Sequence, residues 1–162
     1  MMRVIAVTHL PFAGFFFAAS TARAVLLSIL PLKALSLLGS AQHVSVLFFV
    51  VSVCGIGASL GIYSILRHIS LRTGFLISSL AMVISIVLLW TQDLWTFSLG
   101  MMFHVFGITS MEVILSLYVM QKIPRSQLSE FEPLRMVSTV MALSIGPWLG
   151  VYLQSRYADW LP

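Results

Sequence analysis

The chain alternates between long apolar runs and short polar segments. Apolar residues dominate five stretches, at residues 11–32, 44–66, 73–90, 94–121 and 136–154. Each run is long enough for an α-helix to cross a bilayer, which takes roughly 17–25 residues. A membrane-spanning strand needs only about 9–11 residues and alternates apolar with polar positions, unlike these runs. The pattern predicts an all-α polytopic transmembrane helix bundle with five spans, in one transmembrane domain over residues 1–162.

Composition supports this prediction and excludes several classes of function. Of the 162 residues, 59% are hydrophobic and 9% are charged, and the mean hydropathy is +1.03. Soluble domains carry about 25% charged residues. The net charge of +4 comes from residues scattered between apolar runs, which favours topology and lipid head groups over nucleic acid. With a single cysteine and no visible hydrolase triad, phosphate loop or metal cluster, we expect no enzyme, cofactor or metal.

The positions of lysine and arginine predict the orientation. Cytoplasmic loops carry the excess of these residues. With the N-terminus inside, six basic residues face the cytoplasm: Arg3, Arg67, Arg72, Lys122, Arg125 and Arg135. Only Lys33 and Arg156 then face outward. The expected location is a cell membrane, inner or plasma, with the N-terminus in the cytoplasm. An alternative for the start is a secretory signal over residues 1–24, but the apolar stretch continues past Arg23.

Three polar residues inside the apolar runs are candidates for chemistry. Arg23 lies about 16 Å into the first run at 1.5 Å per residue, and charges at such depth are costly and usually functional. The alternative is that Arg23 extends to an interface. Glu112 shares one helix face with Thr109 and Ser116. Burial favours a protonated carboxyl and a nearby arginine favours a carboxylate, so Glu112 could carry a coupling proton or simply pair with Arg23. His104 suits either proton relay or packing.

The run near the C-terminus, Ala142 to Val151, reads ALSIGPWLGV. It resembles the glycine–proline motif in the fifth helix of major facilitator superfamily antiporters, the drug:proton antiporters in particular, whose pattern is Gly-x-x-x-Gly-Pro-x-x-Gly-Gly. Gly146, Pro147 and Gly150 match, while Ala142 and Val151 replace the outer glycines. Small residues four apart let helices approach closely. The end of the first run, Ile-Leu-Pro-Leu at 29–32, and the following Leu-Gly-Ser-Ala at 38–41 are also similar to the family.

Two segments depart from the family pattern. The loop between helices two and three usually carries Asp-Arg-x-Gly-Arg-Arg. Here Arg67 stands for the first arginine and Arg72 supplies later charge, but Leu66 occupies the aspartate position, so the usual latch is incomplete. In the fourth helix, Phe103 occupies the position of an arginine that lies four residues before Gly107.

The resemblance implies the first five of twelve helices, an incomplete N-terminal half of a major-facilitator fold. It implies proton-coupled efflux of small organic solutes, with Arg23, Glu112, His104 and Thr109 along the pathway. It assigns gating and helix packing to Gly146, Pro147, Gly150, Arg67 and Arg72. The expected partners are the lipid bilayer, a small solute, protons, and either the missing C-terminal half or an oligomer; a fragment alone is expected not to transport. The alternative is a non-transporting membrane interaction subunit or a degenerate remnant.

Overall fold

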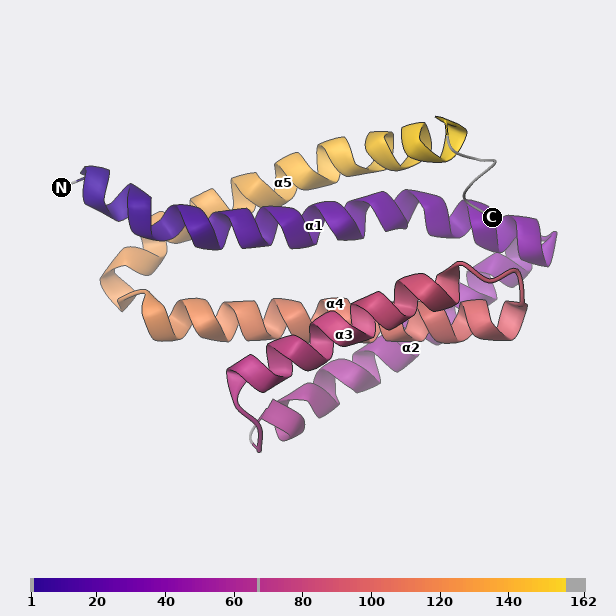
Figure 1. The fold of residues 1–162 in the computed structure, drawn as a ribbon, viewed down its shortest axis with the longest axis horizontal. Coiled ribbons are helices and arrows are strands. Elements are labelled where there is room, and N and C mark those ends of the chain that lie inside the picture. Colours follow the sequence, from indigo (N-terminus) through magenta and orange to yellow (C-terminus); the bar gives the residue numbers. More distant parts are fainter. Residues whose placement is uncertain (1, 67, 157–162) are drawn as a thin grey trace. The chain divides into compact units, whose positions relative to one another are not determined.

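The computed structural model describes residues 2–66 and 68–156, and these residues form five helices (Figure 1). They are α1 (Met2–Leu38), α2 (Ala41–Leu66), α3 (Leu71–Leu89), α4 (Leu94–Lys122) and α5 (Arg125–Arg156). All five are long and apolar enough to cross a membrane. The described part of the chain contains no strand. The predicted all-α bundle of five spans is therefore confirmed.

Local signals explain where the helices begin and end. Gly39 ends α1 in the left-handed conformation, with φ of +64°, and its N–H donates to the Leu35 carbonyl at 2.9 Å. Glycine adopts that conformation without the penalty of a Cβ. Ser70 caps α3 because its hydroxyl accepts a hydrogen bond from the Thr73 N–H at 3.2 Å. The Asp93 carboxylate caps α4 by accepting from the Thr96 N–H at 3.0 Å.

Three helix boundaries differ by several residues from the sequence prediction. Helix α1 begins at Met2 rather than near residue 11 and continues to Leu38 rather than stopping near residue 32. Helix α5 begins at Arg125 rather than near residue 136. Hydropathy marks only the apolar part of a helix, whereas a backbone hydrogen-bonded ladder can continue beyond it. Pro124 directly precedes α5, and Pro133 is accommodated inside it. The expected cytoplasmic loop at 122–135 is therefore mostly helical.

The helices pack into two compact units. The first contains the described residues of Met1–Leu30 and Ser116–Ala158, so it joins most of α1 to α5 and the end of α4. The second contains those of Pro31–Leu115, so it joins α2, α3 and most of α4 to the end of α1.

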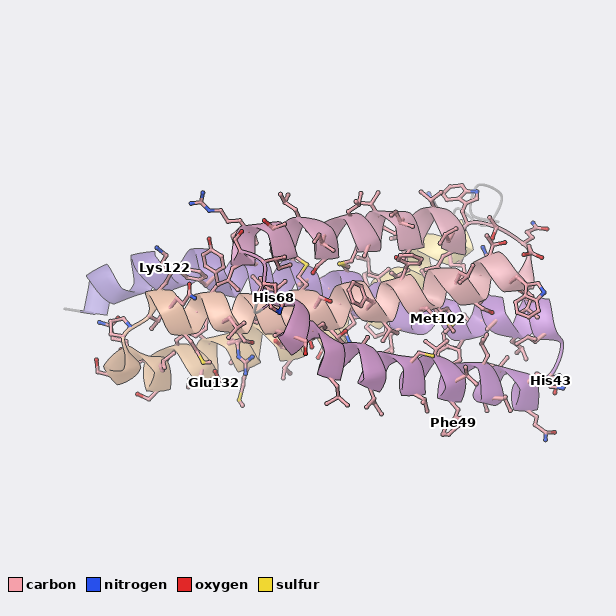
Figure 2. The ribbon with its side chains drawn as sticks, turned by 90° about the horizontal axis from the view of Figure 1, so that it is seen from below. His43, Phe49, His68, Met102, Lys122 and Glu132 are labelled. Carbon is pink, nitrogen blue, oxygen red and sulfur yellow. The ribbon has the colours of Figure 1, made fainter. Side chains whose placement is uncertain are left out.

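Each unit has its own small-residue contacts and its own buried side chains. In the first unit α1 and α5 run side by side (Figure 1), and Phe131 and Ala142 of α5 are fully buried. In the second unit the core includes Phe97 and Ile114 of α4. Outward positions are strongly apolar; Phe49, for example, points away from α2 (Figure 2). Such outward apolar faces are typical of helices that meet lipid.

Candidate functional site

In the first unit the glycine–proline segment lies directly against α1. A Cβ added to Gly146 would collide with the Cβ of Ala24 and lie 3.1 Å from its carbonyl carbon. A Cβ on Gly150 would collide with the Ser28 hydroxyl and lie 2.7 Å from the Val25 carbonyl oxygen. The two backbones therefore approach through positions that carry no side chain on α5. We call this contact the α1–α5 seam, defined by Ala24, Val25 and Ser28 with Gly146 and Gly150.

Pro147 is half-buried and lies inside α5, next to Gly146 of the seam. Proline has no N–H, so the carbonyl of Leu143, four residues earlier, loses its usual helical partner. The same holds at Pro133 for the carbonyl of Ser129. Helix α5 therefore carries two points at which the ladder of hydrogen bonds is interrupted. A kink at such a point needs less distortion than elsewhere in a helix.

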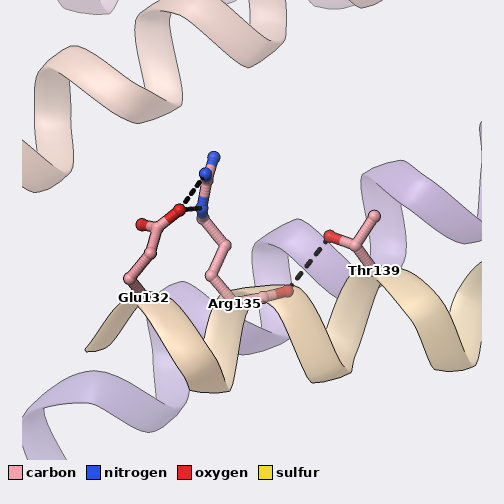
Figure 3. Close-up of polar contacts among 3 residues, drawn as sticks. All are labelled: Glu132, Arg135 and Thr139. Carbon is pink, nitrogen blue, oxygen red and sulfur yellow. Dashed lines mark hydrogen bonds and ion pairs between the residues drawn. The ribbon is translucent and has the colours of Figure 1, made fainter. Parts of the chain in front are cut away.

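Nearer the start of α5, Glu132, Arg135 and Thr139 form a polar cluster (Figure 3), and its arginine contacts α1. The Arg135 guanidinium donates through Nε to the Glu132 carboxylate at 3.1 Å and also through Nη2 to the same oxygen. Its Cζ lies 5.4 Å from the centre of the Phe16 ring on α1. Phe16 in turn packs at 6.3 Å on Phe131. Thr139 donates to the Arg135 carbonyl at 3.1 Å.

The apolar runs end at residue 121 and resume at residue 136, so Glu132 and Arg135 are expected in a cytoplasmic loop. The structure instead places Glu132 and Arg135 one turn apart on a helix, with Arg135 only partly exposed. Their spacing of three residues was the available signal, since residues at i and i+3 are neighbours on a helix. The aromatic partner on α1 had no signal in the sequence. The cation–ring attraction holds Arg135 against Phe16 of α1, and the ion pair with Glu132 orients the Arg135 side chain on α5.

The predicted pathway residues fall in both units. Arg23 lies on α1 immediately before Ala24 of the seam and is exposed, and Glu112 is exposed on α4. Neither side chain is without an interaction partner. Arg23 belongs to the first unit and Glu112 to the second, so their pairing stays a prediction. The Thr109 hydroxyl donates within α4, to the Val105 carbonyl at 2.7 Å.

The second unit holds a seam of small and polar residues between α3 and α4. A Cβ on Gly107 would lie 2.7 Å from the Met82 side chain and 3.2 Å from the Ser78 carbonyl oxygen. His104 lies one turn earlier on α4, on the same face as Gly107, and is 5% exposed. The buried hydroxyl of Ser78 donates to the Gly74 carbonyl at 2.9 Å. His104 is therefore a packed residue of this seam, and whether it relays protons stays a prediction.

A cation fixes the end of α1 to the hairpin between α3 and α4. Lys33, expected in a loop, lies inside α1 and donates through Nζ to the Leu89 carbonyl at 2.6 Å and the Trp90 carbonyl at 3.3 Å. These carbonyls close the C-terminus of α3, where a positive charge is favourable. Lys33 thus acts as a side-chain cap from another helix, a role that sequence spacing could not indicate.

The remaining predicted residues have simpler positions. Arg72 is exposed in the first turn of α3, and Arg67 lies outside the described residues. Gly57 and Gly61, which form a Gly-x-x-x-Gly pair on α2, have no heavy atom within 4 Å of an added Cβ. They therefore pack against nothing in the described part of the chain.

A small cavity lies within the second unit. Its volume is about 20 Å³, which is room for about one water molecule and far below the roughly 300–1,000 Å³ of a ligand pocket. Its walls are almost entirely apolar and come from α2, α3, α4 and the α2–α3 turn: Ile62, Ile69, Gly74, Ile77, Ser78, Phe106, Ser110 and Ile114. This cavity cannot hold an organic solute.

Among the described residues no group of histidine, cysteine, aspartate and glutamate side chains could hold a metal ion. Comparison with protein-family models, with curated proteins and with solved structures gives no match. The resemblance to major facilitator transporters therefore rests on the sequence motifs alone and stays a prediction.

Proposed function

We propose that this chain forms part of a proton-coupled secondary transporter of small organic solutes in a cell membrane, with its N-terminus in the cytoplasm. The observation that carries the proposal is the α1–α5 seam. Gly146 and Gly150 meet α1 without side chains, and Pro147 interrupts the hydrogen-bond ladder at the same level. Such a contact is smooth, so two helices can slide or rock along it without unlocking interdigitated side chains.

The charged residues supply the coupling in this proposal. Arg23 directly precedes Ala24 of the seam, so movement along the seam would move a charge within the membrane. Glu112 is the acidic residue of the α4 span, and an intramembrane carboxyl is a suitable carrier for a proton. Glu112 would bind a proton from one side and release it to the other as the solute moves. Helices from a further protein segment or chain would complete the pathway.

Inverted membrane vesicles provide the test, prepared from cells that contain both the chain and the helices that complete its pathway, as its natural host does. A proton gradient is imposed and followed with a quenched acridine dye, and ethidium serves as the organic probe. With those helices present, we expect ethidium to dissipate the gradient with wild-type Glu112 and not with Glu112→Gln. Vesicles that hold the chain alone should show no response to ethidium. Glu130→Gln is the matched control, because Glu130 is an exposed carboxylate in the first turns of α5, and it should behave as wild type. Equal responses from Glu112→Gln and the wild type would refute the coupling role.

A further inference from the structure

The last two turns of α5 carry an exposed aromatic pair followed by an exposed arginine. The rings of Trp148 and Tyr152 stack at 5.6 Å with an angle of 14° between their planes. Trp148 is 65% exposed and Tyr152 is 47% exposed. Arg156 follows one further turn along, in the last turn of the helix, and is also exposed. We call Trp148, Tyr152 and Arg156 the terminal ledge.

The ledge points away from the rest of its unit. Residues four apart on a helix are offset by about 40°, so its three members lie within one narrow sector of α5. Gly146 and Gly150, which pack on α1, are about 160–200° from Trp148 around the helix. Trp148 therefore lies opposite the α1–α5 seam on α5, and Tyr152 lies next to it. Arg156 lies about 80–120° around the helix from the two glycines and is exposed. In a membrane, that outward face meets lipid.

The spacing along the helix matches the layers of a bilayer. The apolar span that contains the ledge covers Ser126–Arg156, 31 residues, or about 46 Å at 1.5 Å per residue. This exceeds the roughly 30 Å hydrocarbon core, so the helix ends reach the head-group layer. With Arg156 at the level of the phosphates, Tyr152 lies about 6 Å deeper and Trp148 about 12 Å deeper. These depths correspond to the glycerol backbone and the upper acyl chain of one phospholipid.

We propose that the terminal ledge is a binding site for a single phospholipid with an anionic head group, of the phosphatidylglycerol class. The Arg156 guanidinium binds the phosphate, for which its planar donor fork is suited. The Tyr152 hydroxyl lies at the polar boundary, and the stacked rings provide a flat apolar surface for one acyl chain. The positive charge of Arg156 selects an anionic head group, and the Trp148 and Tyr152 rings hold the acyl chain of the lipid. The inference requires only that α5 spans the membrane and does not depend on transport.

The test measures quenching of Trp148 fluorescence by lipids with brominated acyl chains. The other three tryptophans are replaced by phenylalanine, as Trp90→Phe, Trp95→Phe and Trp160→Phe, and the protein is reconstituted in phosphatidylcholine vesicles. Brominated phosphatidylglycerol and brominated phosphatidylcholine are then compared at increasing mole fraction. We expect about a fivefold preference of the Trp148 site for phosphatidylglycerol, the effect of one basic residue beside an anionic lipid. The preference should fall as salt is raised.

Matched variants separate the ledge from general lipid contact. Arg156→Gln should abolish the preference, Arg156→Lys should keep most of it, and Arg72→Gln, which changes an exposed arginine on α3, should leave it intact. A protein whose only tryptophan is Trp95, which is exposed near Asp93, should show no preference. Circular dichroism confirms that each variant keeps its helices.

Three results would overturn the assignment. Equal quenching of Trp148 by the two lipids would show that the site does not select an anionic head group. An unchanged preference in Arg156→Gln would show that the arginine does not bind it. Inorganic phosphate, added as a competitor, should not displace brominated phosphatidylglycerol, since it lacks the acyl chain; displacement would mean that the site takes free phosphate and not a lipid.

Discussion

The α1–α5 seam leads to a quantitative prediction about Gly146. In Gly146→Ala the new methyl group meets the Cβ of Ala24, and backbone atoms of Ala24 lie 3.1–3.2 Å away. Backbone cannot rotate aside as a flexible side chain can, so the two helices must separate. Forced overpacking of this kind costs about 1–3 kcal/mol.

Alanine also gains helix propensity over glycine, by about 0.5–1 kcal/mol, and this gain must be subtracted. Gly14 supplies the control, because it lies in the same unit and on one of the same two helices, and nothing lies within 4 Å of an added Cβ. Gly14→Ala therefore has the propensity gain without the collision. The difference in free energy of unfolding between the two variants isolates the collision, and we expect about 1–3 kcal/mol.

Unfolding of the protein by SDS in mixed micelles, followed by circular dichroism, measures both free energies. Equal stability of Gly146→Ala and Gly14→Ala would refute the close approach at this seam. A second check removes the methyl group that causes the collision: Ala24→Gly should cost less in the Gly146→Ala background than in the wild type. Additive effects of the two substitutions would mean that the residues do not touch.

Three further predictions concern charged groups, and a fourth concerns topology. Lys33→Met removes the cation from the end of α3 and should lower the free energy of unfolding by about 1 kcal/mol in the same SDS titration. Arg135→Ala should lower it by a similar amount, about 1 kcal/mol, because the ion pair is partly exposed and the cation–ring contact is modest. Hydrogen bonds from Thr96 hold the pKa of Asp93 below its ordinary 3.8. The Asp93 carboxylate therefore stabilises the folded protein fully above the unfolded pKa, and this stabilisation is lost as pH falls through the folded pKa. In Asp93→Asn the melting temperature should fall less over that pH range. A reporter active only in the cytoplasm, fused after Pro162, should stay inactive, and strong activity would exclude five spans with the N-terminus inside.

Much of the fold could be predicted from hydropathy, because a run of apolar residues long enough to cross a bilayer has few alternatives to a helix. The ends of the helices were harder to predict. The segment from Lys122 to Arg135 is polar and contains two prolines, yet it is helical from Arg125. Its Glu132–Arg135 pair stabilises a turn of helix, while hydropathy records only that these residues are charged. Gly39, by contrast, marks the end of α1 by its conformation.

Of the candidate site, only the features that depend on neighbouring residues of one segment could be predicted from the sequence. Gly146 and Gly150 lie four apart in one segment, and small residues at that spacing favour a close helix contact. The partner residues on α1 are more than a hundred positions away. Ala24 and Ser28 are also small and four apart, but nothing in the sequence pairs them with Gly146 and Gly150. The same applies to Lys33, whose carbonyl partners at Leu89 and Trp90 depend on how α1 meets the end of α3. Contacts of this kind come from tertiary packing, which a single sequence does not record.

Two pairs of glycines show that the spacing of a motif does not by itself predict a helix contact. Gly57 and Gly61 have the same spacing as Gly146 and Gly150, yet the first pair has no neighbour within 4 Å of an added Cβ and the second pair is in direct contact with α1. Spacing shows only that a helix offers a smooth face; it does not show what the face meets. On α5 the two glycines meet Ala24, Val25 and Ser28 of α1, and Pro147 interrupts the helical hydrogen bonds beside them. A small-residue motif can therefore be interpreted only when the residues that it contacts are known. In this chain they are known for Gly146 and Gly150 at the α1–α5 seam.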